Sequence, residues 1–113
     1  MISIYHNPRC SKSREALDIL DKSKAEYEVI KYMDNTLSIE KLKELVNLLK
    51  IKPIELVRTN ESIWKENYKN SDLTDDELIA AMAKHPKLIE RPIVINGNKA
   101  VIGRPPQKIL DIL

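Results

Sequence analysis

The chain opens, over residues 2–20, with ISIYHNPRCSKSREALDIL, a passage that holds both a change of periodicity and the single cysteine. Its first residues, Ile2–Tyr5, predict a short strand, and apolar residues at helical spacing predict a helix over Cys10–Asp21. Tyr27–Tyr32 predicts a second strand. The N-terminal third therefore predicts a β-α-β unit with Cys10 at the start of its helix.

The middle of the chain has helical periodicity and contains neither glycine nor a low-complexity run. We therefore expect a helical insertion over about residues 36–86 of a single domain that spans residues 1–113. The expected helices are one capped by Ser38, one over Asn60–Tyr68, and one that Thr74 and Glu77 begin as a capping box, with a short turn at Pro53–Val57 between the first two.

The last third returns to strands. Asn96-Gly97-Asn98 separates the apolar runs Ile93–Ile95 and Ala100–Ile102, and this pattern predicts a hairpin. A helix is expected over Gln107–Leu113, after a proline. The whole order, β-α-β, helical insert, β-β-α, is that of the α/β thioredoxin-like fold. Its mixed sheet would take a parallel pair from the first unit and antiparallel strands from the hairpin.

Composition excludes several classes of protein. The 113 residues are 42% hydrophobic and suit one core, and their net charge of +2 is interspersed, which does not favour nucleic-acid binding. No apolar stretch is long enough to span a membrane and no signal-peptide pattern opens the chain, so we expect a cytoplasmic protein. One cysteine and two distant histidines allow no internal disulfide and predict no metal site.

Cys10 is either a buried structural cysteine or a nucleophile. Its neighbours from His6 to Arg14 are all polar or small, which is unusual around a core cysteine. Nearby cations and a helix N-terminus favour the thiolate, the nucleophilic form of cysteine. Ser13 stands where a Cys-x-x-Cys protein has its second cysteine, so a Cys10 adduct would need an external thiol such as glutathione.

Arginine is used sparingly in a chain that writes most of its positive charge as lysine. Arg58, Arg91 and Arg104 lie far from Cys10 in sequence, and the last two each precede a proline. A guanidinium binds tetrahedral oxyanions through paired hydrogen bonds, so these arginines are candidate anion ligands. Surface salt bridges remain the alternative for each of them.

Four segments together resemble the glutaredoxin-coupled arsenate reductase family. They are ISIYHNPRCSKSR at residues 2–14, ELVR at 55–58, LIERPIV at 88–94 and VIGRPP at 101–106. The resemblance covers essentially the whole chain. It implies that a Cys10 thiolate attacks arsenate, that glutathione attacks the adduct, and that glutaredoxin removes the glutathione as arsenite is released.

The same resemblance implies residue roles. Arg58, Arg91 and Arg104 would bind the oxyanion, His6 and Ser13 would help hold Cys10 as the thiolate, and Pro92 would be the cis-proline of thioredoxin-like folds. We also expect a monomer without a bound cofactor, with glutathione as the co-substrate. Two alternatives stay open: a reductase of another small substrate, because Ser11-Lys12 follows the cysteine where well-studied members tend to have Gly-Thr, and a non-enzymatic regulator that binds a protein such as RNA polymerase.

Overall fold

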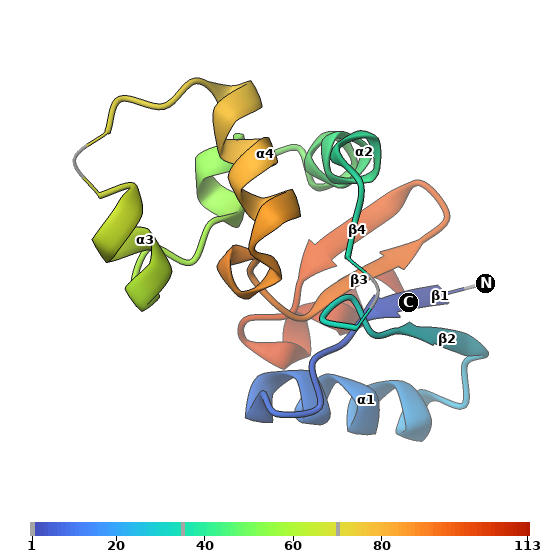
Figure 1. Cartoon of the computed structure of the whole chain (residues 1–113). Coiled ribbons are helices and arrows are strands. Elements are labelled where there is room, and N and C mark those ends of the chain that lie inside the picture. Colours follow the sequence, from blue (N-terminus) through green and yellow to red (C-terminus); the bar gives the residue numbers. More distant parts are fainter. Residues whose placement is uncertain (1, 35, 70) are drawn as a thin grey trace. The chain divides into compact units, whose positions relative to one another are not determined.

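The computed structural model describes residues 2–34, 36–69 and 71–113. Its contacts divide the chain into two compact units, a sheet unit of Met1–Asn35 with Arg91–Leu113 and a helical unit of Thr36–Glu90. The strands and α-helices, labelled in Figure 1, are β1 (Ile2–Tyr5), α1 (Ser11–Ser23), β2 (Tyr27–Ile30), α2 (Ile39–Leu49), α3 (Ser62–Asn67), α4 (Asp75–Lys84), β3 (Ile93–Asn96) and β4 (Lys99–Ile102). The 3-10 helices, marked η, are η1 (Pro53–Leu56), η2 (Pro86–Leu88) and η3 (Pro106–Ile112).

The sheet unit is built on four strands in the order β2-β1-β3-β4. Strand β1 pairs in parallel with β2 and antiparallel with β3, and β3 pairs antiparallel with β4. This confirms the mixed sheet of the predicted α/β thioredoxin-like fold. Strand β2 ends at Ile30, short of the expected Tyr32, because Ile30 lies opposite Tyr5, the last residue of β1.

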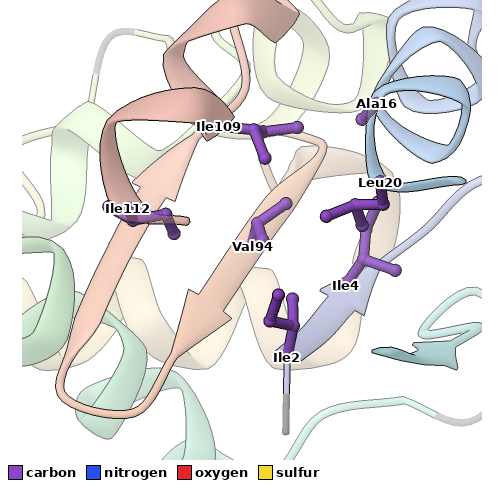
Figure 2. Packing of buried hydrophobic residues seen from close by; sticks show 7 residues of the cluster. All are labelled: Ile2, Ile4, Ala16, Leu20, Val94, Ile109 and Ile112. Atoms are coloured by element: carbon purple, nitrogen blue, oxygen red, sulfur yellow. The ribbon is translucent and has the colours of Figure 1, made fainter. Parts of the chain in front are cut away.

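One face of this sheet is covered by α1 and η3. The buried side chains that join the sheet to α1 and η3, shown in Figure 2, are Ile2, Ile4, Ala16, Leu20, Val94, Ile109 and Ile112. Most are branched aliphatic residues, and fully burying one such side chain stabilises the fold by about 1.5–3 kcal/mol. The face thus fixes α1, and the loop that precedes it, against the sheet.

The C-terminal helix differs from the expected one. It begins at Pro106 and is a 3-10 helix throughout, rather than a helix over Gln107–Leu113. Its buried residues, Pro106, Ile109 and Ile112, recur every third position. A 3-10 helix has three residues per turn, so it places all three on the face that meets the sheet.

Within the helical unit, local capping signals decide where helices begin. The Ser38 hydroxyl accepts a hydrogen bond from the N–H of Lys41 at the start of α2. Thr74 and Glu77 form the expected reciprocal capping box at the start of α4. None of the helices described is long and apolar enough to cross a membrane.

The region after β4 packs so closely that only glycine fits at position 103. A Cβ added to Gly103 would lie 2.9 Å from Cγ of Pro92 and 3.4 Å from Cδ1 of Ile109. The Gly103 N–H also donates to the Pro92 carbonyl at 2.8 Å, which holds the two backbones together. The pyrrolidine ring cannot rotate away, so the added carbon would force a backbone shift.

We expect Gly103→Ala to lower the free energy of unfolding by about 1–3 kcal/mol, the usual cost of overpacking a core. Urea denaturation of the parent and the variant measures this difference. Gly97→Asn is the matched control, because Gly97 has a φ of 62° with nothing within 4 Å of its added Cβ, and asparagine tolerates that conformation. Equal losses in the two variants would contradict the proposed clash.

Candidate active site

The loop between β1 and α1 is held by its own backbone and side chains. The Cys10 N–H donates to the Asn7 carbonyl at 3.0 Å, and the Arg9 N–H donates to the Asn7 side-chain oxygen at 3.1 Å. The Arg14 guanidinium reaches back to the Pro8 carbonyl at 3.1 Å. Cys10 is the N-cap residue of α1. Its sulfur therefore lies beside a helix N-terminus, whose unpaired N–H groups favour negative charge.

Arg104 is the cation that the structure brings to this sulfur. Its Nη2 lies 3.6 Å from Cys10 Sγ, and its Nε donates to the Arg91 carbonyl at 2.7 Å. The β3–β4 hairpin explains the approach, since it begins just after Arg91 and ends just before Arg104. One guanidinium thus holds a backbone oxygen and presents another donor to the sulfur.

Arg91 offers a second donor in the same unit. Its Nε is buried and has no hydrogen-bond partner among the residues that the structure describes. A buried N–H without a partner costs free energy, so this position favours a ligand that can accept a hydrogen bond. The Arg91–Pro92 bond is cis, as the resemblance implied, and Arg104–Pro105 is also cis, which the sequence analysis did not anticipate.

His6 and Ser13 are buried beside the loop and bond to each other. His6 Nδ1 lies 2.7 Å from Ser13 Oγ, and the Asn7 N–H donates to the same oxygen at 3.0 Å. Burial lowers the pKa of His6 below 6.5, the charges of Lys31 and Arg14 lower it further, and a hydrogen bond with the Ser13 backbone acts in the opposite direction. We assign a neutral ring that accepts the Ser13 proton at Nδ1. Among the described residues, neither His6 nor Ser13 forms a hydrogen bond to Cys10 Sγ. Their effect on the thiolate stays a prediction.

Arg58 belongs to the helical unit, where carboxylates surround it. Its Nη1 lies 2.6 Å from Oε1 of Glu61, its Nε lies 3.2 Å from Oε1 of Glu90, and its side chain is 14% exposed. Its N–H also donates to the Leu88 carbonyl at 2.7 Å, beside the bridge between residues 57 and 89. Its predicted role as an oxyanion ligand is untested.

Within residues 2–34, 36–69 and 71–113 no three His, Cys, Asp or Glu side chains gather into a metal site.

The mixed sheet, the cysteine at the start of its first helix and the cis-proline before β3 define a protein of the thioredoxin-like class. Residues 5–112 match the ArsC family over almost the whole length of the chain. The chain belongs to the ArsC family.

Relatives of known name agree with this assignment. An arsenate reductase from Haemophilus influenzae is 43% identical, over 99% of this chain and 98% of its own. The solved structure of an arsenate reductase from Vibrio cholerae is 48% identical with a TM-score of 0.94, over 99% of this chain and 97% of that chain. YfgD of Escherichia coli K12, named as an uncharacterized protein, is 45% identical over 99% of this chain and 96% of its own.

The lowered pKa of His6 predicts a pH-dependent contribution to stability. Between the folded-state pKa and 6.5, the unfolded chain binds more protons than the folded protein. The His6 contribution is therefore fully present above pH 6.5 and is lost as the pH falls through the folded-state value. We expect the parent to lose stability relative to His6→Asn as the pH falls from about 7.5 to about 5.5, by at most about 1.4 kcal/mol per pH unit. Urea denaturation across this range measures it. A constant difference would contradict the prediction.

Proposed function

We propose that this chain reduces arsenate to arsenite through a covalent adduct on Cys10. The observation that carries the proposal is the 3.6 Å contact between Arg104 Nη2 and Cys10 Sγ. It pairs a sulfur nucleophile with a fixed cation that remains charged at every relevant pH. The names of the relatives from Haemophilus influenzae and Vibrio cholerae support arsenate as the substrate.

In the first step the Cys10 thiolate attacks the arsenic atom. A sulfur–arsenic bond forms, one arsenate oxygen leaves as water after taking up protons, and arsenic remains As(V). Arsenate near neutral pH carries close to two negative charges, so an approaching thiolate is repelled unless cations offset the charge. Arg104 Nη2 lies 3.6 Å from the sulfur, and the buried Arg91 Nε has no hydrogen-bond partner among the described residues. The resemblance adds Arg58 as a third ligand.

The second stage needs thiols from outside the chain, because Cys10 is its single cysteine. Glutathione displaces an arsenic-bound oxygen of the adduct, which leaves as water, and so forms a second sulfur–arsenic bond. A glutaredoxin thiolate then attacks that glutathione sulfur, a glutaredoxin–glutathione disulfide forms, and the electron pair of the broken sulfur–arsenic bond stays on arsenic, which becomes As(III). Water finally replaces the Cys10 sulfur on arsenic, so that arsenite leaves and the Cys10 thiol is restored. No bound cofactor is needed. We place this cycle in the cytoplasm, where glutathione is abundant, with the protein acting as a monomer.

A coupled assay tests the proposal directly. Purified protein is mixed with arsenate, glutathione, glutaredoxin, glutathione reductase and NADPH, and NADPH oxidation is followed beside direct measurement of arsenite. The parent should give arsenite in stoichiometry with NADPH, and Cys10→Ser should give none. If the parent makes no arsenite under these conditions, the proposed substrate is wrong.

We expect Arg104→Ala and Arg91→Ala each to lower arsenate turnover by about a hundredfold, which corresponds to about 3 kcal/mol for removing a donor that stabilises developing charge. Arg104→Lys should recover only part of the rate, because lysine restores charge without the paired donors. Lys99→Ala is the control, since Lys99 is exposed at the other end of β4. Folded alanine variants with the parent rate would show that these arginines do not act on the substrate.

We also expect multiple turnover to require glutathione and glutaredoxin together, because the chain lacks a second thiol to resolve the adduct. Thioredoxin with its reductase and NADPH, without glutathione, should not sustain turnover. Arsenite produced per enzyme molecule is the measurement. Full turnover with thioredoxin would contradict the coupling while leaving the arsenate assignment intact.

A further inference from the structure

Two cations close to Cys10 in the chain, Arg9 and Lys12, are not among the residues proposed to bind arsenate. Arg9, immediately before the cysteine, is exposed, and its guanidinium has no hydrogen bond or ion pair to any part of the chain that the structure describes. Lys12, in the first turn of α1, has a side chain that is 45% exposed and lies 3.5 Å from Glu15. A third cation near Cys10 in the chain, Arg14 of α1, donates a hydrogen bond to the Pro8 carbonyl. We call Arg9 and Lys12 the cationic pair.

We propose that the cationic pair binds the carboxylates of glutathione and so brings its sulfur to Cys10. The inference rests on the proposed function in taking glutathione as the resolving thiol, and it assigns residues to a step that Arg91 and Arg104 do not serve. Glutathione carries two carboxylates, and a guanidinium and an ammonium are the side-chain groups that bind carboxylates best.

The burial of Cys10 supports this assignment. The residue is only 7% exposed, so a second sulfur can reach it only past the residues that border it. Arg9 and Lys12 lie one and two positions from it in the chain. A glutathione thiolate carries net negative charge, as does an arsenate adduct, so the two repel each other. Exposed cations one and two positions from Cys10 in the chain reduce that repulsion and raise the local concentration of an anionic thiol.

The test uses a reaction of Cys10 that involves no arsenic. The Cys10 thiolate attacks glutathione disulfide, the disulfide bond breaks, a bond forms between Cys10 and one glutathione sulfur, and the other glutathione leaves as a thiolate. Mass spectrometry of the protein measures the rate at which one glutathione becomes attached to Cys10. The same rate is measured with hydroxyethyl disulfide, which carries no charge. Since arsenate is absent, a protein that fails to reduce arsenate still gives a clear result here.

The variants are Arg9→Gln, Lys12→Gln and the control Lys22→Gln. Lys22 is an exposed lysine of the same helix that pairs with Asp18, as Lys12 pairs with Glu15, but it lies near the other end of α1. We expect Arg9→Gln and Lys12→Gln each to slow the reaction with glutathione disulfide about two- to fivefold, the range of exposed ion pairs. The rate with hydroxyethyl disulfide, and both rates of Lys22→Gln, should stay at the parent values.

Three results would overturn the proposal. Parent rates in both pair variants would show that the cations do not bind glutathione. Equal slowing with the two disulfides would show that they act on the reactivity of the sulfur instead. Slowing by Lys22→Gln to the same extent would show an effect of net charge alone. Raising the salt to about 0.5 M should also shrink the difference between parent and pair variants, because exposed charges are screened at that ionic strength.

Discussion

The site depends on one arginine that makes two contacts at once. Arg104 donates through Nε to the Arg91 carbonyl and presents Nη2 to Cys10 Sγ. The guanidinium is planar and has five N–H donors in a rigid fork, so fixing one donor also orients the others. A lysine could supply the charge but not this orientation. The contact joins the loop before α1 to the segment after β4, and it relies on the sheet and its α1–η3 layer to hold both in place.

Much of the sheet unit could be predicted because its signals are local. Alternation of apolar residues marks β1, and an Asn-Gly turn marks the β3–β4 hairpin. In the helical unit, the Thr74–Glu77 box likewise marks the start of α4. The form of η3 could not be predicted, because Ile109, Ile112 and Leu113 lie at the i, i+3 and i+4 spacing of an α-helix, while Pro106, Ile109 and Ile112 fit the three-residue spacing of a 3-10 helix. The second cis bond, at Arg104–Pro105, also escaped, since tertiary packing decides which isomer an X-Pro bond adopts.

The residue types of the site were predictable, but their partners were not. Ser13 lies 2.7 Å from His6 Nδ1 and accepts a hydrogen bond from the Asn7 N–H, while its predicted effect on Cys10 stays a prediction. Sequence spacing does not say which neighbours a hydroxyl group meets, because that depends on how the loop folds. In the same way, sequence spacing did not reveal that Glu61 and Glu90 surround Arg58. The approach of Arg104 to Arg91 could be predicted, because the two residues flank the β3–β4 hairpin and a hairpin must return its end to its beginning.

The position of β1 in the sheet has a consequence for synthesis on the ribosome. Strand β1 lies between β2 and β3, so one of its edges has no partner until residues 93–96 have been made. The helical unit, Thr36–Glu90, is translated in between. A nascent chain therefore carries the Cys10 thiol long before the arginine that charges its surroundings. The contact between Arg104 and Cys10 Sγ forms only once nearly the whole chain has emerged and folded.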